Sequence, residues 1–298
     1  MMALLVFSGI AALLVVLAGW RDHARDPLLT TALLGLLLVF PALGRWLPKV
    51  ELELVAAATG GGGGTLPEWW SWLWSAVCVG FLARLGGAAL GLERRRRRAV
   101  LVGREDGVEI RMTDGFSGPV AAGVFRKVVF VPVGWARLPA GARRVALDHE
   151  MAHHARRDPL WRWLAELALA VHWFNPLVWW MVRRLAAQCE YACDRRVLRS
   201  GVDPCDYARL LCDFAEVSAV RGPALSMAER AGLEQRVRRM LRDPSGRVRG
   251  GAGVAFAIGL ALALAVAMNM VRPTSETVDG FTAEEVELRW SADPFPGE

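Results

Sequence analysis

The sequence has few cysteines, few lysines and no internal repeat. Its five cysteines are spread unevenly, with no C-x-x-C pair among them (Cys78, Cys189, Cys193, Cys205 and Cys212). A disulfide framework and a ribbon-type zinc site are therefore not expected. Lysine occurs only at Lys49 and Lys127, so arginine carries nearly all of the basic charge behind the net charge of +6. No nucleic-acid recognition motif accompanies these arginines, and we expect no direct binding to nucleic acid.

Apolar residues make up 54% of the 298-residue chain and are concentrated in blocks. Four blocks approach the roughly 20 residues that cross a bilayer as a helix. They are residues 2–20, 28–43, 69–92 and 250–271. The first block lacks both the charged start and the small-residue cleavage site of a signal peptide. We therefore expect an α+β integral membrane protein with about four transmembrane helices in the lipid bilayer.

The arginine run Arg94–Arg98 follows the third block directly. Such a run can bind nucleic acid or anionic lipid, but in this place it is typical of the cytoplasmic end of a transmembrane helix. This orientation puts the N-terminus and the acidic C-terminal tail outside a multi-pass protein of the cell membrane. The expected organisation is a membrane region at 1–93, a cytoplasmic domain at 94–249, a fourth span at 250–271 and an external tail at 272–298.

The expected cytoplasmic domain has the pattern of a mainly helical unit with a small β-sheet. Residues 108–112 alternate like a half-buried strand, and residues 128–131 form a buried strand ending at Pro132. Cap and proline signals predict helices over 139–157, from Asp158 onward, over 176–200, over 204–217 and over 228–241. Charged and polar residues interrupt the apolar stretch 160–182, so we expect a buried or membrane-skirting helical pair there rather than another span.

The letters H-E-M-A-H at 149–153 form an H-E-x-x-H motif. On a helix, His149 and His153 lie one turn apart on the same face. Two imidazoles at this spacing can hold one Zn²⁺ and leave coordination positions open, and Glu150 is then placed to take a proton from the attacking water. The alternative is a chance pattern, but Asp148 and His154 add polar groups that a plain core helix would avoid.

A catalytic zinc site usually has a third protein ligand, and a carboxylate is the better candidate here. Among the other histidines, His23 lies on the wrong side of a span and His172 lies at a helix end. Glu190 and Asp194 share a helix face, so one can bind the metal while the other accepts the outer N–H of a ligand histidine. Two alternatives stay open: a surface ion pair with neighbouring arginines, and a zinc site that includes Cys193.

Four ordered motifs resemble those of the BlaR/MecR-type antirepressor metallopeptidases. They are H-E-M-A-H at 149–153, R-R-D-P-L at 156–160, H-W-F-N-P-L at 172–177 and E-Y-A-C-D at 190–194. The resemblance implies a gluzincin-like fold with zinc on His149, His153 and Glu190, Glu150 as general base, and Asp194 as the residue that orients a ligand. It also implies cleavage of a cytoplasmic protein, often a repressor of the BlaI/MecI type, or of the chain itself.

The sequence departs from the receptors of that family after the fourth span. Those receptors carry a penicillin-binding sensor domain there, whereas this sequence has a short acidic tail, so we do not expect direct β-lactam sensing. Two other interpretations stay open. A membrane protease of the HtpX or CAAX-processing type should have further spans between the motif and the third ligand. A non-enzymatic membrane transducer would use the zinc domain as a scaffold and would need the ligands but not Glu150.

Overall fold

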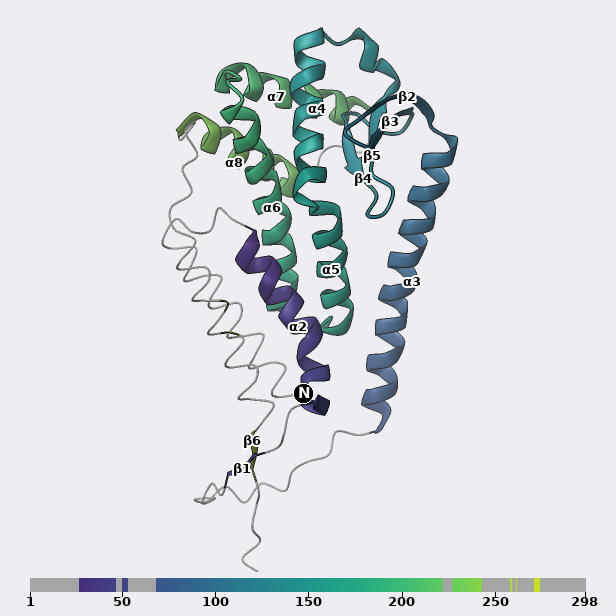
Figure 1. The fold of residues 1–298 in the computed structure, drawn as a ribbon, viewed down its shortest axis with the longest axis vertical. Helices are drawn as coiled ribbons and strands as arrows, with labels where there is room; N and C mark the ends of the chain where they lie inside the picture. The colour runs from purple at the N-terminus through teal and green to yellow at the C-terminus, as the bar shows by residue number, and fades with distance from the viewer. Residues whose placement is uncertain are drawn as a thin grey trace, which may run out of the picture.

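A computed structural model describes residues 27–46, 50–52, 68–221, 227–242, 258, 261 and 271–273 of the chain. The helices are α2 (Leu28–Trp46), α3 (Glu68–Arg98), α4 (Ala140–Arg156), α5 (Asp158–Val171), α6 (Pro176–Arg199), α7 (Pro204–Arg221) and α8 (Met227–Arg242). The strands are β1 (Val50–Leu52), β2 (Val100–Glu105), β3 (Val108–Thr113), β4 (Val120–Ala122), β5 (Val128–Pro132) and β6 (Val271–Pro273). Figure 1 shows α2, α3, α5 and α6 as a bundle, with β2–β5, α4, α7 and α8 gathered at one end. The described part is thus mostly helical with a small sheet.

The four-stranded sheet has the order β2-β3-β5-β4, in which β3 and β5 are parallel and the other pairs are antiparallel. Both predicted strands are confirmed as β3 and β5, and every residue of β5 is buried. The turn from β4 to β5 requires Gly123, because its φ is +85° and a Cβ would collide with the carbonyl oxygen of Arg126. This turn makes β4 an edge strand beside α4.

Helix α4 lies between the sheet and the later helices. It begins after Pro139 and ends at Arg156, as the sequence predicts. On one side Leu147 packs against Val108, Val129 and Val131 of the sheet. On another side Ala146 belongs to a second apolar cluster that includes Tyr207 of α7. The remaining face of α4, which carries the H-E-x-x-H motif, is therefore directed toward α6.

Helices α5 and α6 form the helical pair expected for the apolar stretch 160–182. Asn175 caps α6, because its side-chain oxygen accepts a hydrogen bond from the N–H of Leu177 at 3.0 Å. The pair packs against α2 through a cluster in which Leu33, Met181 and Leu185 are at most 1% exposed. This apolar cluster forms the core of the half that lies away from the sheet.

The expectation of four membrane spans is tested only in part. Among the described residues, the segment Trp69–Arg98 of α3 is the helix long and apolar enough to cross a membrane. The second expected span corresponds to α2, whose apolar part Leu28–Val39 is shorter. The first block and nearly all of the fourth lie outside the described residues. The number of spans therefore remains a prediction.

A short parallel pairing between β1 and β6 was not predicted. It joins Val50 to Val271 and Leu52 to Pro273. Val271, which the sequence analysis assigned to the end of the fourth span, is a strand residue. The pairing brings the segment after α2 next to the segment after the fourth apolar block, which is consistent with the predicted placement of both on the same side of the membrane.

Candidate metal centre

The motif face of α4 presents three buried polar side chains. His149, Glu150 and His153 are between 6 and 9% exposed. Because α4 is a regular helix through the motif, the two imidazoles lie one turn apart. Their rings meet edge to face, with centroids separated by 5.0 Å and planes at 85°. Glu150 lies between them in sequence and faces the sheet. The local sequence therefore fixes two imidazoles and one carboxylate on a single rigid element.

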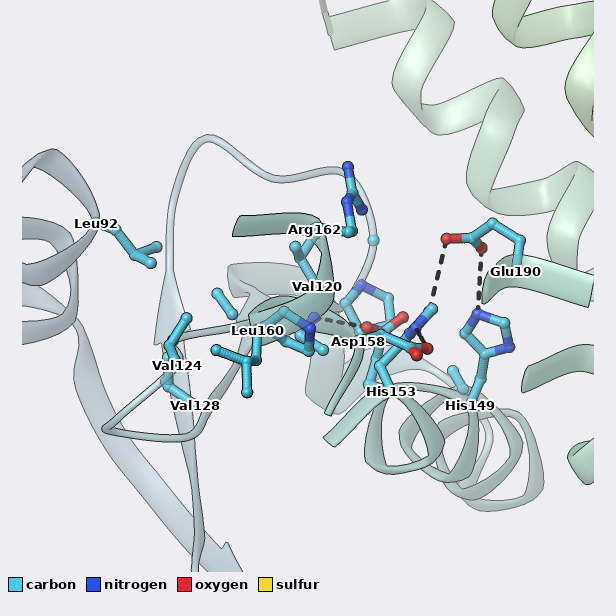
Figure 2. Close-up of a pocket in the computed structure, with 18 of the residues that line it drawn as sticks. Leu92, Val120, Val124, Val128, His149, His153, Asp158, Leu160, Arg162 and Glu190 are labelled. Carbon is cyan, nitrogen blue, oxygen red and sulfur yellow. Dashed lines mark hydrogen bonds and ion pairs between the residues drawn. The ribbon is translucent and has the colours of Figure 1, made fainter. Parts of the chain in front are cut away.

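Glu190 comes to this face from α6. Its two carboxylate oxygens lie 3.5 Å from Nε2 of His149 and 3.6 Å from Nε2 of His153. One possible ligand atom from each of these three residues lies within 4.8 Å of the other two. Figure 2 shows Glu190 facing both imidazoles across the same gap. The structure thus brings together the three residues that the sequence analysis selected as metal ligands.

Asp158 contacts the Nδ1 atom of His153, on the side of the ring away from Glu190. This contact was not predicted from the sequence. Nδ1 of His153 lies 2.9 Å from Oδ2 of Asp158, which is itself 2% exposed. The prediction that Asp158 caps α5 was wrong, since the cap position is Arg157, in the left-handed conformation with φ of 60°. That sharp junction between α4 and α5 turns the first residue of α5 back onto His153. The tautomer that keeps Nε2 free for a metal donates its Nδ1 proton to Asp158.

Tyr207 and Asp194 hold the far side of His149. The Tyr207 hydroxyl lies 2.7 Å from Nδ1 of His149 and donates to Oδ1 of Asp194 at 2.8 Å. Asp194 itself is 3.4 Å from the same ring nitrogen. The structure therefore places Asp194 behind His149, as expected, but with Tyr207 of α7 as the closer partner. Tyr207 was not predicted as a site residue, because it lies 58 residues from the histidine and no local pattern connects the two.

Arg236 of α8 joins the two carboxylates of α6. Its guanidinium donates to both oxygens of Asp194 at 2.7 and 2.9 Å and lies 3.1 Å from Glu190 Oε2. Burial opposes the charge on Glu190, but the contacts with His149 and Arg236 outweigh it and lower the pKa of that carboxyl. Glu190 is therefore ionised and available to a cation.

Glu150 differs from the other carboxylates of the site in that its hydrogen-bond partner is a backbone N–H group. Its Oε2 accepts a hydrogen bond from the backbone N–H of Ala121, in edge strand β4, at 2.6 Å. Burial raises the pKa of Glu150, in spite of the opposing effect of His149 and His153. A carboxyl with a raised pKa is a better proton acceptor and donor near neutral pH than an ordinary one.

The other residues considered from sequence lie outside the three-residue cluster. His154 bonds through Nε2 to the carbonyl oxygen of Val128 and ties α4 to β5, and His172 bonds to the carbonyl oxygen of Leu37 in α2. Cys193 is closer to the site than a residue with only a packing role would need to be. Its Sγ lies 3.3 Å from Nδ1 of His153 and 3.6 Å from Asp158 Oδ2. Its sulfur thus lies on the Nδ1 side of the ring, opposite Glu190.

A cavity of about 960 Å³ adjoins the cluster. His149, Glu150, His153 and Glu190 lie in its wall. Its remaining wall is largely apolar and comes from α3, the β4–β5 segment, α5, α7 and α8 (among others Leu92, Val120, Leu160, Leu211 and Phe214). In Figure 2 the apolar side chains Leu92, Val124 and Leu160 lie to one side of the histidines. The cluster therefore faces a space large enough for several side chains of a peptide.

Comparison with known proteins agrees with this geometry. Residues 97–240 match the family model described as BlaR1 peptidase M56. Over 126 residues, the chain is 26% identical to a protein named Regulatory protein BlaR1 from Bacillus licheniformis. That alignment covers 41% of this chain and 21% of the relative, so most of the relative's length lies outside it. Residues 97–240, which hold every side chain of the cluster, are thus similar to the peptidase domain of the BlaR1-type M56 family.

Proposed function

We propose that this protein is a membrane-bound zinc metalloendopeptidase that hydrolyses peptide bonds of a cytoplasmic protein or of the chain itself. The observation that carries the proposal is the convergence of Nε2 of His149, Nε2 of His153 and the carboxylate of Glu190, with the buried Glu150 carboxyl on the same helix face. If the two histidines and Glu190 formed only a structural ion pair, the additional acid Glu150, which has no ion pair of its own among the described residues, would not be needed beside them.

The donor set fits zinc. Two imidazole nitrogens and one carboxylate oxygen make up a common ligand set of catalytic zinc, which leaves a further coordination position open. Each imidazole has a polar group at its far nitrogen, Asp158 for His153 and Tyr207 for His149, and such partners fix the tautomer that binds metal. When bound, the metal would lower the pKa of water and polarise the scissile carbonyl.

Glu150 is proposed as the general base. Its carboxylate takes the proton from the attacking water and passes it to the leaving amine. The N–H of Ala121 orients this carboxylate from the sheet side. Burial, which raises the pKa of Glu150, makes its carboxylate a stronger base toward the proton of the attacking water.

Edge strand β4 supports a binding mode for the substrate. An extended peptide can add to an exposed strand edge through backbone hydrogen bonds. β4 is an edge of the sheet, and its Ala121 contacts Glu150, so an added strand would run past the cluster. The apolar wall of the cavity would then receive substrate side chains. Arg236 and Tyr207 also line the cavity and are proposed as donors to a developing negative charge.

The membrane location rests on α3 and the residues around it. The segment Trp69–Arg98 has the length and composition of a span and ends in an arginine run, which favours a cytoplasmic position for the domain at 94–249. The proposed protein is multi-pass, with its N-terminus and its tail outside the cell. A repressor of the BlaI/MecI type is the proposed cytoplasmic substrate, because the relative is named as a regulatory protein.

Cleavage in cells tests the enzymatic proposal against a scaffold role. The chain is co-expressed with a tagged candidate repressor, as wild type, as Glu150→Gln and as Glu216→Gln, which alters an exposed glutamate on α7. Shortened repressor or shortened chain should appear with wild type and Glu216→Gln and be absent with Glu150→Gln. Signalling that persists in Glu150→Gln without any cleavage product would instead establish a transducer that does not use the acid.

A further inference from the structure

The helical pair α5–α6 has features of a membrane-inserted element. We propose that α5, the turn at 172–175 and the first half of α6 form a re-entrant hairpin. This hairpin enters the lipid bilayer from the side that holds the metal centre and returns to that side. The partner of this surface is the hydrocarbon of the bilayer. The inference rests on the proposed membrane location and is independent of the peptidase chemistry.

Contacts with α3 set the depth of the hairpin. The Arg84 guanidinium lies 2.5 Å from Glu166, the Cys78 thiol donates to the carbonyl oxygen of Ala170 at 3.1 Å, and the Trp74 indole donates to that of Val171 at 3.1 Å. These contacts run in order along α3 and in reverse order along α5, so the two helices are antiparallel neighbours, as Figure 1 shows. The hairpin turn therefore lies at the level of the tryptophans that begin α3.

The length of α3 gives an estimate of how deep the hairpin turn lies in the bilayer. From Trp74 to the arginine run at Arg94, an α-helix rises about 30 Å, which is the thickness of the bilayer hydrocarbon. The rings of Trp70 and Trp173 are neighbours, with centroids 6.3 Å apart, so the turn reaches the opposite end of this segment from the arginines. If α3 crosses the membrane, the turn of the hairpin lies near the far interface.

The backbone of the turn is satisfied by side chains. The carbonyls that end α5 have no partner within the helix. Those of Ala170 and Val171 accept hydrogen bonds from Cys78 and Trp74, and in the turn the carbonyl of Trp173 accepts one from the Trp179 indole at 2.8 Å. Water can satisfy such groups in a surface turn, whereas a turn within a bilayer must satisfy them internally. The use of side-chain donors at these three carbonyls fits the second environment.

Charged residues are few in the middle of the hairpin, while Asp158, Arg162, Arg183 and Arg184 lie toward its ends on the side of the metal centre. Glu166 is the only Asp, Glu, Lys or Arg between Trp163 and Val182, and Arg84 is the only one between Trp69 and Leu92. These two residues are each other's partner, about midway along α3 between Trp74 and Arg94. Charged side chains within membranes occur chiefly as such pairs, because an unpaired charge in hydrocarbon is costly.

The outward side chains are large and apolar. Trp161 and Leu177 of the hairpin are 37% and 39% exposed, and Trp72 and Val79 of α3 are 76% and 63% exposed. Soluble proteins rarely expose a continuous apolar face of this kind. With the paired charges and the hydrogen-bonded carbonyls near the turn, this composition favours lipid over a water-soluble partner.

Depth-dependent fluorescence quenching tests the hairpin directly. The full chain with Cys205→Ser and Cys212→Ser retains only buried cysteines. Leu177→Cys on the hairpin or Val79→Cys on α3 is added, labelled with a polarity-sensitive dye and reconstituted into phosphatidylcholine–phosphatidylglycerol vesicles. The water control is the exposed native Cys205 in the Cys212→Ser chain.

The proposal predicts blue-shifted emission and little loss of signal to aqueous iodide at both new positions. Lipids brominated in the middle of their acyl chains should quench the Val79→Cys label, and lipids brominated close to the headgroup should quench the Leu177→Cys label, which lies near the far interface. Cys205 should show the reverse. A Leu177→Cys label quenched by iodide while the Val79→Cys label remains in lipid would overturn the hairpin and point to water or a second copy at that face. Iodide quenching at both positions would overturn the membrane location itself. Neither readout depends on cleavage, so a failure of the peptidase proposal is distinguishable.

Substitution of the charge pair provides a second test. Arg84→Leu or Glu166→Leu alone leaves one charge unpaired in hydrocarbon, and the yield of folded protein extracted from membranes should fall roughly tenfold or more. The double substitution should restore most of that yield. At a water-exposed surface the single substitutions would be nearly neutral. Near-wild-type yields for both single variants, or a double variant as poor as they are, would overturn the proposal.

Discussion

Helix α6 passes through two different environments. In its first half, Val178, Met181 and Leu185 are at most 1% exposed and pack into an apolar cluster with α2 and α5. In its second half, Glu190 and Asp194 face imidazoles and a guanidinium. One continuous helix therefore links the apolar half of the molecule to the metal centre, and a change in one half can be compared with a change in the other on the same backbone.

The two halves differ in the number of their charged side chains and in how these are paired. Within the part of the chain that the structure describes, the apolar half holds one ion pair, Arg84–Glu166. The metal centre holds four carboxylates, and three of them have a cationic partner: Arg236 serves Glu190 and Asp194, while Arg156 and His153 lie beside Asp158. Among the described residues, Glu150 has only the N–H of Ala121 as a hydrogen-bond donor. That difference leaves Glu150 free to exchange a proton, whereas their polar partners lower the pKa values of Asp158 and Glu190 against the effect of burial.

The largest expected effect is on metal binding. Glu190→Gln removes a charged ligand and should weaken zinc binding by at least about 100-fold, more than the loss of an outer partner of a ligand. The measurement is a competition titration of detergent-solubilised protein against a zinc chelator. Glu216→Gln, on the exposed face of α7, is the matched control and should retain the wild-type affinity. Equal affinities for both variants would show that Glu190 does not bind the metal.

The apolar half should affect stability without affecting the metal. Met181→Ala empties a fully buried position on the same helix and should destabilise the protein by about 2 kcal/mol or more. Thermal unfolding in detergent measures this effect, with the partly exposed Leu177→Ala on α6 as control. Zinc affinity of the folded protein should be unchanged. A large loss of zinc affinity in Met181→Ala would break the separation of the two halves.

A smaller effect on metal binding is expected from Asp158. Asp158→Ala removes the acceptor that orients His153, which should weaken zinc binding or cleavage by about 10- to 100-fold. The exposed Asp213→Ala on α7 is the control and should be neutral. If Asp158→Ala binds zinc as tightly as wild type, the contact with His153 serves folding rather than the metal.

The smallest effect concerns acid stability of the sheet. The hydrogen bond from Arg111, together with Arg96 and against the effect of burial, lowers the pKa of Glu109 to about 2. Because the folded-state pKa is depressed, the stabilisation is present above the unfolded pKa of about 4.3 and is lost as the pH falls toward 2. The thermal midpoint of wild type should therefore fall more steeply between pH 5 and 2 than that of Glu109→Gln. Parallel curves would contradict this assignment.

Sequence patterns predicted the residues whose relation is local. His149, Glu150 and His153 are set by one helical turn, and so are Glu190 and Asp194. The buried strand at 128–131 and the Asn175 cap were likewise predictable, because apolar runs and Asn-Pro pairs act over a few residues. For the same reason the expected helices were correct in number over the described part of 139–242, with ends displaced by a few residues.

The residues that were missed depend on tertiary packing. Tyr207 and Arg236 reach the site from α7 and α8, and nothing in their own surroundings marks them. Asp158 was taken for a helix cap, because Asp-Pro is a common start signal. The left-handed conformation of Arg157 makes that residue the cap instead. Position 157 is not a glycine, so the sequence did not signal this conformation.

The proposed hairpin also bears on the HtpX-type alternative, since it would place membrane-deep helices between the motif and Glu190. The match of residues 97–240 to the BlaR1 peptidase M56 model, rather than the number of spans, therefore favours the BlaR1-type interpretation.

Paired assays of zinc and cleavage test the central claim most directly. Wild type and Glu150→Gln are purified in detergent, bound zinc is quantified, and cleavage of the chain or of a candidate repressor is timed on the same preparations. The account predicts equal zinc in both proteins and a rate at least about 100-fold lower in Glu150→Gln, the contribution of a general base. Wild-type protein without zinc, or equal cleavage rates at equal zinc, would contradict it.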